Sequence, residues 1–206
     1  MSVRAVLADT PELLRCAYDL RFEVFTEEQG YDPELDSYDH VAVPMLLQHQ
    51  DTQEVVGVLR ILPASLSKIQ HEFYPRSALA CDSMPGAGRS EADMKAIFLE
   101  HQVTQADEDG TCWYSGAKIG RLAVKRGFRS HGYGRIILRE AEEWIKRTVK
   151  EAQSAPGRIG VAFQLSSQEP ARGFYEAQGY HILGDAYIEE GQPHIKCEKR
   201  VVVGDV

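Results

Sequence analysis

Several common functional signatures are missing from this sequence of 206 residues. It has no Cys-x-x-Cys pair and no His-x-x-x-His or His-Glu-x-x-His spacing, which argues against a metal site of the usual kinds. No apolar run approaches the roughly 20 residues that a membrane helix needs, so no membrane association is expected. The cysteines are scattered, which favours reduced thiols over a disulfide framework; they are Cys16, Cys81, Cys112 and Cys197.

Composition and charge limit the classes of partner. The chain begins directly with a strand pattern at residues 3–7 and has no apolar signal segment, so we expect a cytoplasmic protein, with the nucleus as an alternative. The formal net charge of −8 argues against a nucleic-acid partner and favours a cationic substrate such as an amine. With 43% hydrophobic residues and no internal repeat, residues 1–206 are expected to form a single domain.

The most informative segment spans residues 119–138. An apolar run at residues 119–124 predicts a buried strand, and a loop with Gly132 and Gly134 leads from it into an amphipathic helix. Glycine lets the backbone turn sharply and lets a ligand approach it closely. The loop N–H groups and the helix N-terminus would converge on one point, with Arg129 and Arg135 beside it. The pattern predicts an anion site for a phosphorylated cofactor, although an ordinary surface loop is the simpler alternative.

The glycine spacing separates this loop from two standard phosphate loops. No Gly-Lys-Ser/Thr triplet follows, and the dinucleotide fingerprint would need a third glycine and a later acidic residue. The pattern Arg129-x-x-Gly132-x-Gly134 after an apolar strand resembles motif A of the GNAT superfamily of N-acetyltransferases. The resemblance implies that acetyl-CoA is the co-substrate, without a metal. It assigns cofactor binding to Leu122, Ala123, Val124, Arg129, Ser130, His131, Gly132, Tyr133, Gly134 and Arg135.

Three further segments match the same family in its order. Residues 159–165 predict a strand, and a short helix follows with Ser166 or Ser167 as its N-cap and Pro170 in its first turn. That helix carries Phe174-Tyr175-Glu176-x-x-Gly179-Tyr180, which resembles the family's second signature. Residues 21–29 and a hairpin at 184–198 fit one branch of the family. The fold implied is α/β (α+β), with a mixed, mostly antiparallel twisted sheet splayed at the cofactor site and flanked by helices.

The remaining elements follow from periodicity and turn chemistry. Asp9 or Thr10 is expected to cap the first helix, which leads into a polar, acidic loop at residues 30–40. Strands at 42–49 and 54–62 form a predicted hairpin. Residues 64–115 are an atypical insertion, with a helix expected at 91–105 and an acidic turn at 107–110. A long insertion of this kind favours a lid, a substrate wall or a homodimer contact over a passive loop.

Acetyl transfer to an amine needs an oxyanion donor, a proton donor for the departing thiolate and a base for the amine. By resemblance, the amides of Leu122 and Val124 bind the pantetheine arm, Leu122 faces the thioester oxygen, and Tyr175 is the general acid. Glu28 and His194 are both candidate bases, and each has a plain structural alternative. The cluster Asp36, Asp39 and His40 would line an acidic acceptor pocket or would belong to a solvated loop.

We therefore expect an N-acetyltransferase that moves an acetyl group from acetyl-CoA to a primary amine by direct attack in a ternary complex. The acceptor would be a small molecule, a peptide lysine or a peptide N-terminus. A member of another functional class, a non-catalytic acyl-CoA-binding sensor or scaffold, remains the alternative because no base is evident. The sequence does not identify the acceptor.

Overall fold

The computed structural model of this chain describes residues 2–205 except positions 33, 64, 65, 67, 68, 81–83, 154–156 and 190. Cys81 and Glu190 therefore lie outside the described residues. The strands are β1 Val3–Leu7, β2 Leu35–Asp36, β3 Val43–His49, β4 Val55–Leu62, β5 Phe73–Tyr74, β6 Val103–Ala106, β7 Cys112–Val124, β8 Arg158–Gln168, β9 His181–Glu189 and β10 Gln192–Asp205. The α-helices are α1 Pro11–Arg21, α2 Glu91–Glu100, α3 Tyr133–Ala152 and α4 Arg172–Glu176.

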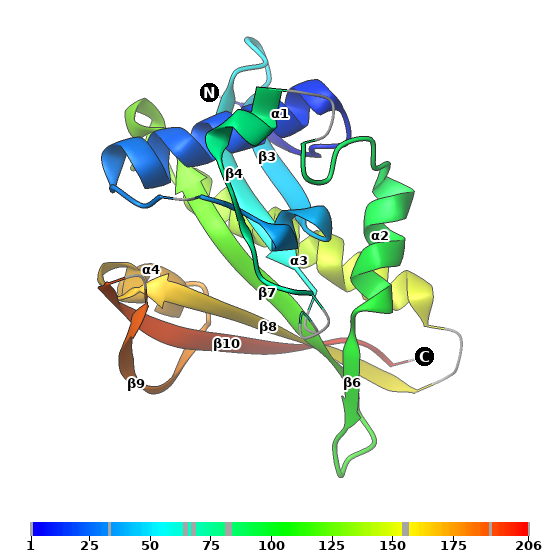
Figure 1. The fold of residues 1–206 in the computed structure, drawn as a ribbon. Coiled ribbons are helices and arrows are strands. Elements are labelled where there is room, and N and C mark those ends of the chain that lie inside the picture. Colours follow the sequence, from blue (N-terminus) through cyan, green and yellow to red (C-terminus); the bar gives the residue numbers. More distant parts are fainter. Residues whose placement is uncertain are drawn as a thin grey trace.

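One eight-stranded sheet organises the chain, in the order β1-β3-β4-β7-β8-β10-β9, with β6 also paired to β7 (Figure 1). All its pairs are antiparallel except β7 with β8. Successive residues of a strand point to opposite faces. Accordingly, Leu46 of β3 packs in the core that contains α1, whereas Leu47 packs in the core that contains α3. The helices α1 and α3 thus cover opposite faces of the sheet.

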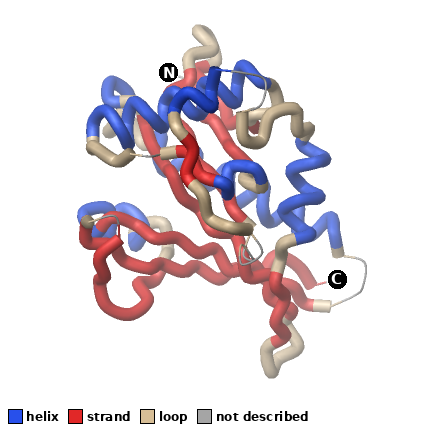
Figure 2. Tube along the Cα trace, viewed as in Figure 1, coloured by secondary structure: helices blue, strands red, loops and turns tan. Residues whose placement is uncertain are grey.

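The sheet opens between its two central parallel strands. β7 and β8 pair from Cys112↔Ile159 to Lys118↔Gln164, and the described residues beyond these positions share no further register. Figures 1 and 2 show β8, β10 and β9 diverging as a separate layer from β4 and β7 toward α4. The expected splayed, mixed and mostly antiparallel sheet is therefore confirmed.

A β-bulge interrupts β7 in this opening. Val58 pairs with Ala123 and Arg60 pairs with Gly120, so Arg121 and Leu122 together face the single residue Leu59. Arg121 has φ +50°, a left-handed conformation that is uncommon for residues other than glycine. The bulge takes this part of the strand out of regular pairing where the sheet splays.

Local sequence signals predicted many of the elements correctly. Thr10 caps α1, with its side chain accepting a hydrogen bond from the Leu13 backbone N–H. The first strand spans the expected residues, and the hairpin of β3 and β4 forms as expected. The predicted apolar stripe of α3 is buried at every position; it consists of Ile137, Leu138, Ala141, Trp144, Ile145 and Val149.

Two boundaries were predicted wrongly. The helix expected at 91–105 ends at Glu100, and Val103–Ala106 form β6. β6 pairs with Cys112–Ser115, the half of β7 that β4 does not reach, so strand pairing overrides any helical tendency there. Ser166 and Ser167 are not helix caps, because β8 continues through them, paired with β10, as far as Gln168.

Candidate active site

Three cavities follow one another along the opening between β7 and β8. The loop cavity, about 460 Å³, is bounded by the glycine loop, Val124 and Phe174. The central cavity, about 270 Å³, lies between Leu122 on β7 and Tyr175 on α4. The far cavity, about 160 Å³, adjoins the central cavity, and the two share Gly120, Arg121, Ser166 and His194. A ligand reaching from the glycine loop to His194 would lie along this row.

The glycine loop has the conformation that its sequence predicted. Gly132, at φ +77°, is the N-cap residue of α3. A Cβ at Gly134 would lie 3.5 Å from the Phe174 ring, so the loop passes close to the helix that carries Tyr175. Most of the predicted cofactor residues border the loop cavity; these are Val124, Arg129, Ser130, Gly132, Tyr133, Gly134 and Arg135.

The other three predicted cofactor residues are placed differently. Leu122 lines the central cavity. Ala123 is 3% exposed and its side chain packs in the core beneath α1, which leaves only its backbone for a cofactor. His131 does not line the loop cavity, and its Nδ1 lies 2.7 Å from the carbonyl oxygen of Arg129.

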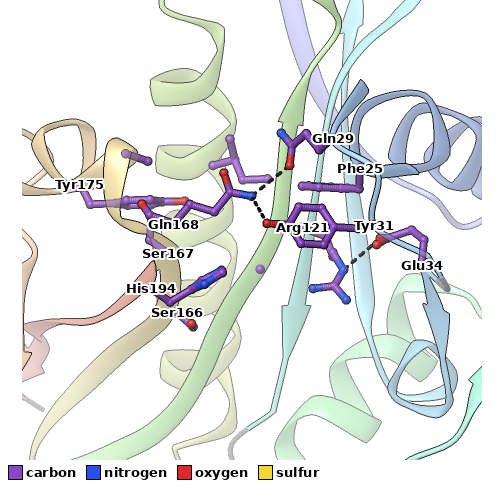
Figure 3. Close-up of a pocket in the computed structure, with 13 residues that line it drawn as sticks. Phe25, Gln29, Tyr31, Glu34, Arg121, Ser166, Ser167, Gln168, Tyr175 and His194 are labelled. Carbon is purple, nitrogen blue, oxygen red and sulfur yellow. Dashed lines mark hydrogen bonds and ion pairs between the residues drawn. The ribbon is translucent and has the colours of Figure 1, made fainter. Parts of the chain in front are cut away.

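Tyr175 extends from α4 into the central cavity (Figure 3). Its side chain is 9% exposed and packs edge-to-face on Phe174 and Tyr180. Burial, with a smaller contribution from Cys197, raises the pKa of the Tyr175 hydroxyl well above its ordinary value. The hydroxyl therefore stays protonated at neutral pH and is suited to donating a proton rather than accepting one.

His194 borders both the central and far cavities. In the central cavity it lies opposite the residues that follow α1, such as Tyr31 and Glu34 (Figure 3). It belongs to β10, the second strand of the final hairpin. Its Nδ1 lies 3.0 Å from the carbonyl oxygen of Gln192. A carbonyl oxygen can only accept, so Nδ1 carries the proton in the neutral ring and Nε2 has the free lone pair. That tautomer can take a proton at Nε2.

Glu28 lies apart from the central cavity. Its carboxylate accepts a hydrogen bond from Arg129 at 2.8 Å, and Arg126 lies 3.8 Å away. Glu28 is not among the residues that line any of the three cavities. The arrangement brings Tyr175 and His194 together and places Glu28 at the glycine loop instead.

Of the acidic cluster after α1, Asp36 lines the far cavity, but Asp36 and Asp39 are both paired with arginine and do not form a solvated loop. Asp36 and Asp39 are at most 2% exposed, and both accept hydrogen bonds from Arg60. Asp39 also pairs with Arg21 at 2.8 Å. Although burial opposes its ionisation, these two arginines hold the pKa of Asp39 well below its ordinary range. His40 is exposed and packs edge-to-face on Tyr74.

Sequence reasoning missed a side-chain bridge across the central cavity. Gln168 donates from Nε2 to Gln29 Oε1 at 3.0 Å and to the Tyr31 hydroxyl at 3.3 Å. Figure 3 shows this side chain reaching from β8 over β7 to the segment that follows α1. No local pattern could have revealed it, because the two sides are 139 residues apart in sequence.

A second missed feature is a fixed carboxylate beside His194. Glu189 lines the far cavity and accepts hydrogen bonds from the hydroxyls of Ser166 and Tyr187. Burial opposes its ionisation, but these hydrogen bonds and nearby positive charge leave the pKa of Glu189 below its ordinary value. A negative charge there favours an ammonium group in the same cavity.

Within the part of the chain that the structure describes, no group of three or more His, Cys, Asp or Glu side chains is arranged to hold a metal ion. None of the helices formed by these residues is long and apolar enough to cross a membrane.

Comparisons with known proteins agree with this geometry. Two acetyltransferase (GNAT) domain models match the chain, one over residues 20–102 and one over residues 96–182. A UPF0039 protein of Schizosaccharomyces pombe is 35% identical over 79 residues, which are 38% of this chain and 47% of that protein. The match thus spans about half of that relative's length.

The solved structures that share the fold include two acyl-CoA-dependent enzymes. An acyl-CoA N-acyltransferase from Pseudomonas aeruginosa superimposes with a TM-score of 0.59 at 18% identity, covering 96% of this chain and 99% of that one. The CoA-dependent acyl-homoserine lactone synthase BjaI, solved with SAM and isopentyl-CoA, gives a TM-score of 0.54 at 16% identity over 98% and 83% of the two chains. The two domain matches together extend from residue 20 to residue 182, and with this fold they establish that the chain belongs to the GNAT acetyltransferase superfamily.

Proposed function

We propose that this protein is an N-acetyltransferase that moves an acetyl group from acetyl-CoA to a primary amine by direct attack in a ternary complex. The observation that carries the proposal is the unpaired opening between β7 and β8. The glycine loop borders this opening at one end, and Tyr175 and His194 line the cavity next to it. A cofactor with a diphosphate at one end and a thioester at the other suits such a row of cavities.

The glycine loop would hold the diphosphate through its backbone N–H groups and the N-terminus of α3. The amides of Leu122 and Val124 would bind the pantetheine arm as an added strand does. At the bulge, the amide of Leu122 would donate to the thioester oxygen as negative charge develops there.

The reaction needs two proton transfers around one acyl transfer. His194 Nε2 would take the proton that the ammonium group must lose before its nitrogen can attack the carbonyl carbon. As the tetrahedral intermediate collapses, the carbon–sulfur bond breaks and the Tyr175 hydroxyl would protonate the departing thiolate. Glu28 is the weaker candidate for the base, because its carboxylate is already paired with Arg129.

The acceptor would enter from the far cavity. His71 and Phe73, both within the insertion at residues 64–115, line that cavity, which supports a role for the insertion as a substrate wall within a single domain of residues 1–206. The insertion is also our candidate for a homodimer contact. We further propose that the protein is cytoplasmic. The acceptor would be a small amine, a peptide lysine or a peptide N-terminus.

The acyl group is a separate question, because the central cavity of about 270 Å³ is larger than an acetyl group requires. BjaI was solved with isopentyl-CoA, so a branched short acyl group is the second candidate. The alternative function is a sensor that binds acyl-CoA without turnover. A sensor would need only the glycine loop and the cavities that hold acyl-CoA. The protonated Tyr175 and His194, which line the same cavity, could supply an acid and a base and therefore favour the enzyme.

A thiol-release assay separates these possibilities. Acetyl-CoA and isopentyl-CoA are each incubated with the protein and a panel of polyamines, amino sugars, amino acids and peptides. We expect release of CoA that depends on one class of amine and is faster with acetyl-CoA. Binding of both thioesters without release across the panel would instead identify a sensor.

A further inference from the structure

Arg121 is the strained residue of the bulge, and its side chain has a specific anchor. At φ +50° it adopts a conformation that a residue with a Cβ keeps only when its surroundings impose it. Its Nε donates to Glu34 Oε1 at 2.9 Å, and its guanidinium lies 6.0 Å from the centre of the Phe25 ring. Figure 3 shows Arg121 and Glu34 meeting at the edge of the central cavity.

Glu34 is a rigid anchor because it is itself fixed. Its side chain is 2% exposed, and the same oxygen, Oε1, accepts a hydrogen bond from Arg21 Nε at 2.8 Å. Arg21 is held in turn by Asp39. The network thus connects the segment after α1 to the bulge, which lies 87 residues later in the sequence.

We propose that Arg121 is a positioning residue, clamped by Glu34, that holds the β7 bulge in the conformation presenting the Leu122 amide to the thioester oxygen. The inference rests on the proposed function for the role of that amide. Arg121 acts through its own backbone and takes no part in the proton transfers. Removing its side chain releases the clamp while Glu34 keeps its ion pair with Arg21, so Glu34 is not left unpaired in the interior and we expect the fold to be kept.

Arg121 lines both the central and the far cavity, so direct recognition of a carboxylate on the acceptor is the competing role. The two roles affect different quantities. A direct contact changes the KM for the acceptor, and alanine and glycine at position 121 are then equally harmful. A positioning role changes kcat, and glycine is the better replacement because it adopts φ near +50° without strain.

The kinetic experiment uses Arg121→Ala, Arg121→Gly and Arg139→Ala, the last being a control at an exposed arginine of α3. We expect Arg121→Ala to lower kcat roughly 10- to 100-fold with the KM for the amine changed less than threefold, in the range of losing one oxyanion donor or somewhat below it. Arg121→Gly should recover at least part of that loss, and Arg139→Ala should match the wild type. An increase confined to KM, equal for alanine and glycine, would overturn the proposal.

A second measurement needs neither turnover nor ligand. Glu34→Gln changes a residue remote in sequence, and its effect on the bulge can be followed by the Leu122 amide resonance in ¹⁵N-leucine-labelled protein. We expect that resonance to move while the resonance of Leu165, on β8 across the opening, stays in place. An unmoved Leu122 resonance in folded Glu34→Gln would refute the clamp, even if the protein proves to be a sensor; a moved resonance without turnover would refute only the proposed function.

Discussion

Glu28 accepts a hydrogen bond from Arg129 at 2.8 Å, and the Arg129 Nε donates to the Val124 carbonyl oxygen at the same distance. Arg129 of the glycine loop therefore links Glu28, at the end of the helical segment that follows α1, to Val124, the last residue of β7. This arrangement changes what the glutamate is expected to do. We propose that its charge orients Arg129 beside the proposed phosphate site and that another residue takes the proton from the amine.

Glu28→Gln is accordingly expected to weaken CoA binding and to leave the acid limb of the pH profile unchanged. The variant loses the charge that orients Arg129, a partly exposed ion pair with a modest contribution, so we expect a dissociation constant about two- to tenfold higher. Calorimetry measures the affinity, and kcat/KM as a function of pH measures the base. A lost acid limb in Glu28→Gln would instead make Glu28 the base.

His194→Gln should show the opposite behaviour. The amide cannot accept a proton as an imidazole does, so kcat should fall roughly 100-fold, within the range of losing general base catalysis, while CoA affinity stays unchanged. In the wild type, kcat/KM should decline on acidification because a protonated imidazole cannot act as a base. Steady-state kinetics across pH checks both points. Wild-type rates in the folded variant would remove His194 from the mechanism.

Tyr175 and Tyr180 are both buried, so Tyr175→Phe and Tyr180→Phe form a matched pair of variants. Among the described residues, none hydrogen-bonds to the Tyr175 hydroxyl, so its loss should leave the melting temperature nearly unchanged while kcat falls roughly 10- to 1,000-fold.

The Tyr180 hydroxyl donates to Glu142 at 2.9 Å, and that carboxylate also pairs with Lys199. Tyr180→Phe should therefore lower the melting temperature by losing a buried hydrogen bond to a charged group, with kcat unchanged. Thermal melts and turnover rates are measured on both variants. If Tyr175→Phe keeps its kcat while chemistry limits the rate, Tyr175 is only a packing residue.

Asp39→Asn tests the buried ion-pair network. Removing one charge leaves Arg21 and Arg60 incompletely paired in the interior, so we expect a loss of about 3–5 kcal/mol in the free energy of unfolding. Because the folded-state pKa of Asp39 lies below its unfolded value near 3.9, its contribution is complete above about pH 5 and declines as the pH falls below 4.

Chemical unfolding at pH 7 and pH 3.5 measures both effects. The wild type should lose more stability than Asp39→Asn between these two pH values. Equal losses would mean that ionisation of Asp39 does not contribute to the pH dependence of the free energy of unfolding.

The sequence predicted the elements whose signals are local. Thr10 and Pro11 define the start of α1, and the glycine spacing at Gly132 and Gly134 identified the loop before α3. The acid and histidine pattern was harder to interpret, because its meaning depends on distant partners. From the sequence, Asp36 and Asp39 were expected to line an acceptor pocket or to belong to a solvated loop. The structure shows that Arg60, from β4, donates hydrogen bonds to both.

Other parts of the site had no sequence signal. The bulge at Arg121 depends on the register of β4 against β7, and the bridge from Gln168 to Gln29 depends on how two layers approach each other. Both arise from long-range packing. The end of α2 was misplaced for the same reason, since Val103 becomes extended only because β7 offers it a partner edge.

Binding of CoA at the loop before α3 is the central proposal, and calorimetry with CoA on Gly132→Val and Gly110→Val tests it most directly. Both glycines have positive φ, +77° and +81°, and a Cβ would meet only the Arg135 side chain at 3.8 Å at Gly132 and nothing within 4 Å at Gly110, so valine strains the two backbones alike. Only Gly132 belongs to the loop before α3; Gly110 lies in the turn between β6 and β7. We expect wild-type affinity for CoA in Gly110→Val and no detectable binding in folded Gly132→Val. Unchanged affinity in folded Gly132→Val would contradict it.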